Sequence, residues 1–211
     1  TVGDGRVRLR GNLSQYPWPA DQGGQLNVSA RISGGSLYYS SGWPRITGIS
    51  GELAFRGKQL TMTARTASIM GHPLTRVRAH IADLYFNDEI LEASGEVEAP
   101  TADVLRFIAT TPVGPMIDRA TDGMQAQGRG RLALRLELPL RHLQDSTVQG
   151  SYQFLANRLT VDAQLPPLEQ LNGRLEFTES AVRMAGGALV VFGQPATVSL
   201  DSQKDGSIRV A

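Results

Sequence analysis

Apolar and polar residues alternate along most of the chain. In QLTMTA (59–64) every second residue is apolar, and in RLALRLELPL (131–140) a leucine recurs at every second position. The same period of two continues in QLNVSARI (25–32) and RVRAHI (76–81). Because side chains of a strand point alternately to its two faces, this pattern predicts strands with one apolar and one polar face.

Turn signals separate the alternating runs. Asp205–Gly206 is typical of a two-residue hairpin turn, and residues 86–89 form a second expected turn between Leu84 and Ile90. The chain holds 23 glycines, many of them at the start of an alternating run. Together these features predict an all-β fold, mostly an antiparallel meander of short strands.

One segment departs from the alternation. Residues 102–109 carry apolar residues at helical spacing, with Thr101 as the expected N-cap and Pro112 as the stop. A second short helical stretch is expected over residues 116–120. The predicted organisation is a first β-rich unit over 1–98, a short helical insert over 99–127 and a second β-rich unit over 128–211, all in one continuous sheet.

The two β-rich parts repeat one another. Shifted by 122 residues and without a gap, residues 44–75 match residues 166–197 at eight identical positions. The pairs are Pro44/Pro166, Gly51/Gly173, Leu53/Leu175, Phe55/Phe177, Met62/Met184, Gly71/Gly193, Pro73/Pro195 and Thr75/Thr197. Apolar residues, glycines and prolines recur while polar positions vary. This is typical of a stacked structural unit rather than of a duplicated catalytic site.

Composition excludes several classes of function. The chain of 211 residues has 21 basic and 20 acidic residues, and Lys58 and Lys204 are its only lysines. This balance gives no reason to expect a nucleic-acid partner or a polybasic membrane-binding patch. The absence of cysteine excludes disulfides, thiolate metal sites and cysteine nucleophiles. The chain begins in a glycine-rich polar stretch and ends inside an alternating run, so we expect it to be a piece of a longer polypeptide.

No arrangement of polar residues predicts catalysis. His72, His80 and His142 are not spaced as metal ligands, and solvated histidines are the simpler interpretation. Acidic residues fall at turns and near strands, and none marks an acid–base pair. The chain has no G-x-S-x-G elbow, and GRGR (128–131) leads into an expected strand rather than a helix. We therefore predict no catalytic residue, no metal site and no cofactor.

Aromatic residues gather near two prolines. Trp18 lies in YPWP and Trp43 in GWP, with Tyr38 and Tyr39 close to the second. Such a cluster could bind a sugar or a membrane surface. A packing role at the edge of a sheet is the favoured interpretation.

Several segments, taken in order, resemble one family. WPRITGISGELAF (43–55) followed by GHP (71–73) resembles the AsmA-like superfamily. YPWPADQGGQLNVSARISGGSLYYSSGWP (16–44), LRFIATTPVGP (105–115) and RLALRLELPL (131–140) look like its YhdP branch. The resemblance covers most of the chain, from Gly5 to Val198.

This resemblance implies a long periplasmic protein that is anchored in the inner membrane of Gram-negative bacteria, with the anchor outside this chain. It implies an extended, strongly curved, mostly antiparallel sheet that forms a groove with an apolar interior. The implied activity is the movement of phospholipid from the inner toward the outer membrane, which supports the outer-membrane barrier. The implied partners are phospholipid acyl chains, neighbouring repeat units of the same polypeptide, and both membranes.

The predicted lining of the groove follows from the matched alternation in the two halves. It comprises Leu53, Phe55, Leu60, Met62, Ile69, Leu175, Phe177, Val182, Met184, Leu189 and Val191. Alanines on the same expected face leave room for acyl chains. Alternation alone does not separate an open groove from a core covered by a second sheet. A structural or adhesive β-module is therefore an alternative, and a glycan-acting enzyme on a β-scaffold is a third.

Overall fold

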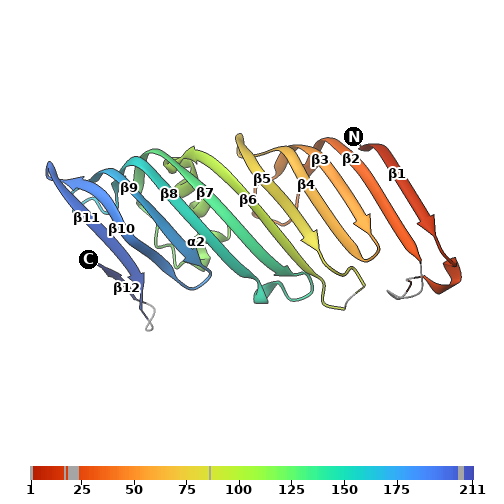
Figure 1. Cartoon of the computed structure of the whole chain (residues 1–211). Coiled ribbons are helices and arrows are strands. Elements are labelled where there is room, and N and C mark those ends of the chain that lie inside the picture. The colour runs from red at the N-terminus through yellow and green to blue at the C-terminus, as the bar shows by residue number, and fades with distance from the viewer. Residues whose placement is uncertain (1, 17, 19–23, 86, 204–206) are drawn as a thin grey trace. The chain divides into compact units, whose positions relative to one another are not determined.

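The computed structural model describes residues 2–16, 18, 24–85, 87–203 and 207–211. In this part of the chain, twelve strands follow one another in sequence order within one open sheet (Figure 1). They are β1 (Val2–Arg10), β2 (Gln25–Leu37), β3 (Ile46–Arg56), β4 (Gln59–Ile69), β5 (His72–Ile81), β6 (Ile90–Pro100), β7 (Gln125–Pro139), β8 (Thr147–Thr160), β9 (Leu168–Thr178), β10 (Val182–Val191), β11 (Gln194–Ser202) and β12 (Ile208–Val210). Adjacent strands from β1 to β5 and from β8 to β12 pair in antiparallel orientation. The predicted all-β antiparallel meander is confirmed.

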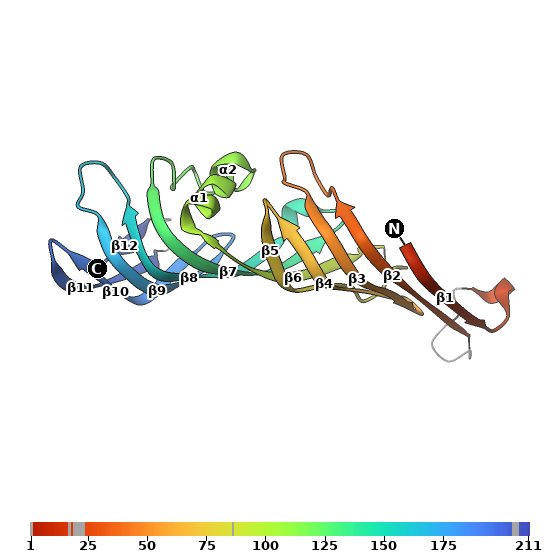
Figure 2. The same cartoon turned by 90° about the horizontal axis from the view of Figure 1, so that it is seen from above.

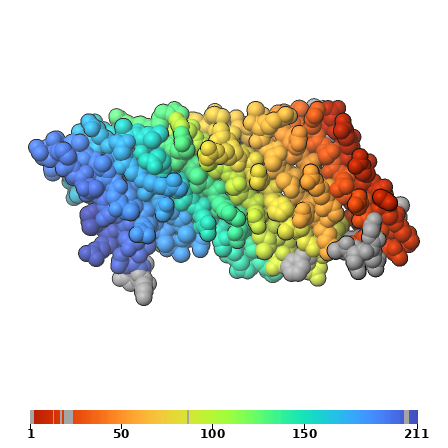
Figure 3. Space-filling model, viewed as in Figure 1, coloured from red at the N-terminus to blue at the C-terminus, as the bar shows by residue number. Residues whose placement is uncertain are grey.

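The strands belong to two compact units. Unit 1 contains Thr1–Leu37, Arg45–Gly95 and Arg135–Thr147, and unit 2 contains Tyr38–Pro44, Glu96–Leu134 and Val148–Ala211. Strands β6 and β7 contribute residues to both units. Within each unit, neighbouring strands succeed one another across the surface in the order of the chain (Figure 3). The division predicted at residues 98 and 127 stays a prediction.

In unit 1, the register of the sheet aligns the apolar residues in rows across the strands. The rows are Val28, Phe55, Leu60 and Ile81; Ala30, Leu53, Met62 and Ala79; and Ile32, Gly51, Ala64 and Val77. Strand β1 extends the first row, because Val7 lies opposite Val28. Side chains of one row lie on the same face of the sheet, so β1 to β5 present one apolar face.

In unit 2, the same organisation recurs on β8 to β11. Tyr152 lies opposite Leu175 on β9, and Phe177 lies between Gly150 on β8 and Val182 on β10. The other face carries a charged row of Glu176, Arg183, Asp201 and Arg209, in which the sign alternates from strand to strand. Opposite charges at directly paired positions favour this register.

The sequence repeat corresponds to five strands, β1 to β5 and β7 to β11. Strands β3 and β9 begin and end at positions that differ by 122. Irregular backbone recurs at the same offset: positive φ angles occur at Gly34 and Ala156, at Gly48 and Gln170, at Met70 and Phe192, and at Gly71 and Gly193. The first two pairs lie at irregularities of the register and the last two in turns between strands, so the repeat preserves backbone geometry as well as apolar character.

The helical insert consists of α1 (Thr101–Thr110) and α2 (Val113–Met116), and Figure 2 shows both helices on one face of the unit 2 strands. The insert was predicted, but two details were wrong. Pro100, not Thr101, occupies the N-cap of α1, with no side-chain cap hydrogen bond, because the Thr101 hydroxyl is used in a tertiary contact. The second helix ends at Met116, where it was expected to begin, because residues 111–116 fold back on α1 immediately after Pro112.

Two short 3₁₀ turns, Leu13–Gln15 and Leu143–Asp145, complete the regular structure. The turn expected at 86–89 includes Phe86, and the Asp205–Gly206 hairpin falls within 204–206. Those positions lie outside the described residues. The strands that flank the second of these turns, β11 and β12, pair antiparallel.

Candidate functional site

The predicted lining residues of unit 1 lie together on its apolar face. Leu53 is directly opposite Met62, and Phe55 is directly opposite Leu60. All four side chains are half-buried. Ile69 lies farther along the same pair of strands, opposite Ile46. We call the three rows of β2 to β5 together with Val7 the unit 1 apolar face.

The opposite face of the same strands is polar. Thr61 lies between Ala54 and His80 in the register, and its hydroxyl is 3.4 Å from His80 Nδ1. His80 Nδ1 is also 3.0 Å from the carbonyl oxygen of Leu60. Thr61 and His80 are directly paired, so both side chains lie on the polar face. A shift of the strand register by one residue would exchange the polar and apolar faces.

The unit 1 apolar face is partly exposed, although one of its members, Ile81, is buried. The buried apolar side chains of this unit are Trp18, Ala67 and Ile81. Val7, in the first row, is 71% exposed. In a β-sandwich, a second sheet would bury these positions at about 10 Å. Apart from Ile81, the side chains of the unit 1 apolar face are therefore partly open to solvent among the residues that the structure describes.

The predicted lining residues of unit 2 are packed more closely. Met184 is 2% exposed and Leu189 5% exposed, and Leu171, which was not predicted, is equally buried. A β-carbon at Gly187 would lie 2.8 Å from Met184 Sδ. The absence of a side chain at Gly187 thus makes room for the Met184 thioether. Met62 and Met184 occupy equivalent repeat positions, yet only Met184 is enclosed.

The other predicted residues of unit 2 are half-buried. Leu175, Phe177 and Val182 lie in the rows already described, and Val191 lies opposite Gln194 beside the β10–β11 turn. The structure therefore places Val191 at the end of the strand pair, away from the row of Phe177. Alternation along the sequence does not predict where Val191 lies, because the bulge between Met184 and Gly187 shifts the register of the residues that follow it.

A buried polar cluster joins α1 to the sheet of unit 2. The Thr101 hydroxyl donates to Asn157 Oδ1 and lies 2.7 Å from the Tyr152 hydroxyl, and Asn157 Nδ2 donates to the carbonyl oxygen of Arg129 over 2.6 Å. Thr101, Tyr152 and Asn157 are 3%, 6% and 0% exposed. We call these three residues the Thr101 cluster. Burial raises the pKa of Tyr152 above its ordinary value, although the hydrogen bond to Thr101 acts against this shift.

Two glycines of β7 make space for the cluster. A β-carbon at Gly130 would lie 2.2 Å from the Tyr152 hydroxyl, and one at Gly128 would lie 3.1 Å from the Asn157 Cα. These are the glycines of GRGR, which leads into a strand as predicted. Sequence reasoning missed the cluster. The signal was available in the repeat, because Tyr152 and Asn157 correspond at the same offset to Ala30 and Gly35.

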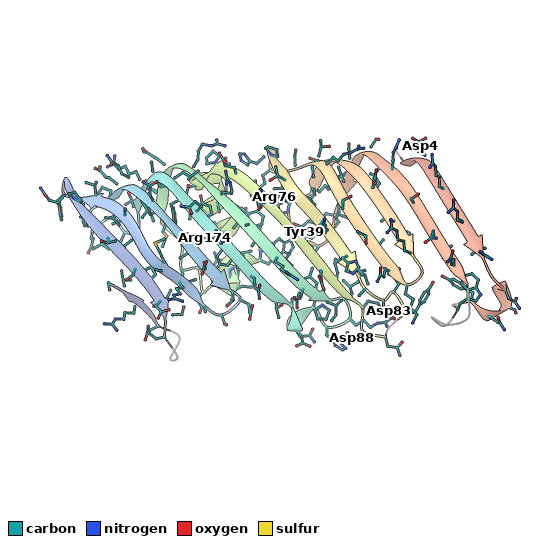
Figure 4. The ribbon with its side chains drawn as sticks, in the orientation of Figure 1. Asp4, Tyr39, Arg76, Asp83, Asp88 and Arg174 are labelled. Carbon is teal, nitrogen blue, oxygen red and sulfur yellow. The ribbon has the colours of Figure 1, made fainter. Side chains whose placement is uncertain are left out.

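Both tryptophans pack within the molecule, as favoured from the sequence. The Trp18 indole Nε1 donates to the carbonyl oxygen of Asn12 over 2.6 Å. Trp43 lies against Phe107 of α1, with ring centroids 6.0 Å apart, and Tyr39 packs on its other side. Burial raises the pKa of Tyr39, which is labelled in Figure 4.

Charged side chains lie on the polar face and at the strand ends. Glu98 accepts hydrogen bonds from Arg131 and Arg129, which lower its carboxyl pKa, and Arg141 lowers the pKa of Glu89 in the same way. Such exposed pairs contribute little to stability. A depression of ≈ 330 Å³ on the polar face is lined by Arg174, Glu176, Arg183, Ala185 and Gly186, and Arg174 is labelled in Figure 4.

Neither a metal cluster nor a membrane-spanning helix occurs in the described ranges. No group of three or more His, Cys, Asp or Glu side chains there is arranged to hold a metal ion. Neither described helix is long and apolar enough to cross a bilayer.

Comparison with known proteins gives one match. A family model described as YhdP protein matches residues 1–211. Searches of curated proteins and of solved structures returned no match.

Proposed function

The chain belongs to the YhdP family, and on this premise we propose that its apolar face binds phospholipid acyl chains as a segment of a lipid-transfer conduit. The observation that supports this proposal is the unit 1 apolar face. Three aligned rows cross four strands there, and all their side chains except that of Ile81 remain partly exposed. Exposed contiguous apolar surface of this kind marks an interaction site.

The mechanism that we propose is passive. Each buried CH₂ of an acyl chain gains about 0.8 kcal/mol relative to water. Neighbouring strands lie roughly 4.8 Å apart, so an acyl chain that crosses them along one row meets another apolar residue at each strand. The binding free energy then changes little from one strand to the next, and a lipid can move without an energy source within the segment itself.

The face composition suits a moving ligand. Ala30 and Ala79 flank Leu53 and Met62 in one row, and Ala64 lies in the next row. Small residues leave space above the sheet, and a thioether tolerates varied apolar neighbours. The headgroup would remain in water, since the rows carry no charged side chain that could pair with it.

The cellular setting is part of the proposal. We place the chain in the periplasm, within a protein anchored in the inner membrane, where it would carry phospholipid between the inner and outer membranes and support the outer-membrane barrier. Neighbouring repeat units of the same polypeptide would extend the apolar face. We assign no catalytic role to any residue, since binding and release suffice for this activity.

Photo-crosslinking tests the proposal directly. The probe is a phosphatidylethanolamine vesicle that contains a tracer phospholipid with a diazirine in one acyl chain. Trypsin releases residues 59–65, which contain Leu60 and Met62, as one peptide. We expect lipid adducts on this peptide in the wild-type protein.

A matched pair of variants gives the control. Met62→Asp places a carboxylate on the apolar face, and Thr61→Asp places one on the polar face of the same strand. An acyl chain over a carboxylate costs several kcal/mol, so Met62→Asp should reduce adducts more than about tenfold. Thr61→Asp should leave them nearly unchanged. Equal adduct yields in both variants, or none in the wild type, would contradict the proposal.

A further inference from the structure

We propose that α1 and α2 form a gate over the apolar face of unit 2, held closed by the hydrogen bonds of the Thr101 cluster. This inference rests on the proposed function, because it concerns access of acyl chains to the same kind of surface. In the closed state seen here, α1 lies on the side of the sheet that carries Tyr152 and Asn157 (Figure 2). An acyl chain on β8 and β9 would have to displace it.

The internal repeat shows that the docking site is an addition to the common unit. Tyr152 and Asn157 occupy the positions held in the first repeat by Ala30 and Gly35. The backbone bulge beside these positions is the same in both copies, with positive φ at Gly34 and Ala156. The two copies therefore share a backbone that needs neither a tyrosine nor an asparagine. Both polar groups contact α1 through Thr101, which accounts for their presence in the second copy.

The Thr101 cluster is the most deeply buried part of the contact between α1 and the sheet. Thr101 is the only buried residue of α1, whereas Val104, Leu105, Phe107 and Ile108 are half-buried. The N-terminus of α1 has no side-chain cap. Each hydrogen bond in a buried polar cluster has a large effect, because the groups find no water while the contact is closed. Once α1 lifts, water can satisfy all three residues.

The two helices can move as one body. A β-carbon at Gly114 of α2 would lie 2.9 Å from the carbonyl oxygen of Ile108, so the helices pack closely. The Thr111 hydroxyl between them accepts a hydrogen bond from the Val113 amide. Strand β6 runs to Pro100 and α1 begins at Thr101, so the insert follows the strand directly.

The same crosslinking probe, a phosphatidylethanolamine vesicle with a diazirine-acyl tracer, tests the gate. Trypsin releases residues 142–158 as a single peptide that contains Tyr152 and Asn157, so adducts beneath α1 can be counted against those on residues 59–65. Thr101→Val removes the shared hydroxyl without changing either peptide. Thr110→Val is the matched control, since the Thr110 hydroxyl only donates to the carbonyl oxygen of Arg106 at the exposed end of the same helix.

We expect Thr101→Val to raise the ratio of 142–158 adducts to 59–65 adducts on the order of tenfold, which corresponds to about 1.4 kcal/mol. Thr110→Val should leave the ratio unchanged. If Thr101→Val does not fold, Tyr152→Phe repeats the test, because it removes a single hydroxyl. An unchanged ratio in the variant that folds would overturn the gate while leaving the adducts on 59–65, and with them the proposed function, intact. Absence of adducts on 59–65 would overturn both.

Thiol labelling gives a second measurement, whose result depends on whether the helix moves. The chain has no cysteine, so Ile108→Cys introduces one reactive group at a half-buried position of α1 and leaves the Thr101 cluster intact. We expect a maleimide to label it more slowly in buffer than when the vesicles are present. Thr110→Cys, at an exposed position, should react at one rate in both conditions. An Ile108→Cys labelling rate that vesicles do not change would contradict a gate that lipid opens.

Discussion

An aspartate at Met62 and one at Met184 should have very different effects on stability, although the two positions are equivalent in the repeat. Met62 is half-buried on an open face, whereas Met184 is 2% exposed beneath its neighbours. The comparison therefore tests whether the unit 1 apolar face is open. It uses one substitution in two copies of the same structural unit.

The expected magnitudes follow from burial and ionisation. Removal of a fully buried methionine costs about 1.5–3 kcal/mol. Keeping an enclosed aspartate neutral at pH 7, against an ordinary pKa of about 3.9, costs roughly another 4 kcal/mol. Met184→Asp should thus lose about 5–7 kcal/mol, which is a large part of the 5–15 kcal/mol typical of a folded domain. Met62→Asp should lose only about 1 kcal/mol, because its carboxylate can reach water.

The pH dependence separates the two costs. In the folded state, burial would raise the pKa of the carboxyl introduced at Met184 above its unfolded value. The neutral form is then present in both states below about pH 4, and stability falls as the pH rises through the unfolded pKa. Met184→Asp should therefore recover much of its loss near pH 4. Met62→Asp should show little change over the same range.

Each unit contains one tryptophan, so its unfolding can be followed separately. Trp18 belongs to unit 1 and Trp43 to unit 2. In a Trp43→Phe background only Trp18 fluoresces, so urea unfolding measures the effect of Met62→Asp on unit 1. In a Trp18→Phe background only Trp43 fluoresces, so the same experiment measures the effect of Met184→Asp on unit 2. Met62→Leu and Met184→Leu are controls and should each cost less than about 1.5 kcal/mol. An equal loss for both aspartates would mean that unit 1 has a covered core, and the structural β-module would replace the lipid conduit.

Three further outcomes are expected. Gly51→Ala should destabilise unit 1 by more than about 2 kcal/mol in urea unfolding, because its β-carbon would lie 2.0 Å from the Thr63 carbonyl oxygen, whereas Gly186→Ala meets no atom within 4 Å and should be neutral. Since burial raises the pKa of Tyr152, the folded chain should lose stability as the pH rises above 10.0, where the unfolded tyrosine ionises first, and Tyr152→Phe should lessen this loss in alkaline urea titrations. Alanine in place of any single His, Asp, Glu or Ser should leave outer-membrane permeability nearly unchanged in cells that depend on the protein, and a tenfold defect from one carboxylate would favour the enzyme alternative.

Much of the fold could be predicted because one physical rule governs most of it. Period-two alternation predicted the strands, and the repeat predicted which apolar positions are equivalent, such as Leu53 and Leu175. Cross-strand register then placed Leu53 beside Met62 without further information. The open state of the face could not be predicted, because a covered sheet and an open one require the same alternation.

The missed features all depend on contacts between residues far apart in the chain. Thr101 has the sequence of an N-cap, but the buried partners Tyr152 and Asn157 are 51 and 56 residues away. From the local sequence, the Thr101 hydroxyl is expected to bond a nearby backbone amide as an N-cap. In the fold it instead bonds the distant residues Tyr152 and Asn157, in a contact that excludes water. The enclosure of Met184 likewise depends on Gly187 and on a bulge that alternation does not reveal.

The differences between the two repeats carry as much functional information as their shared features. A conduit needs equal binding free energy along its length, and identical units would provide it. The second copy instead encloses Met184 and adds a polar docking site for α1 at positions where the first copy has Ala30 and Gly35. Replacing a small residue by a buried asparagine is unfavourable unless every polar atom is paired. While α1 is docked, Asn157 meets this condition through Thr101 on one side and the Arg129 carbonyl on the other. If the proposed gate is correct, acyl-chain access to the second unit depends on the position of one helix, whereas the first unit leaves its apolar face partly exposed.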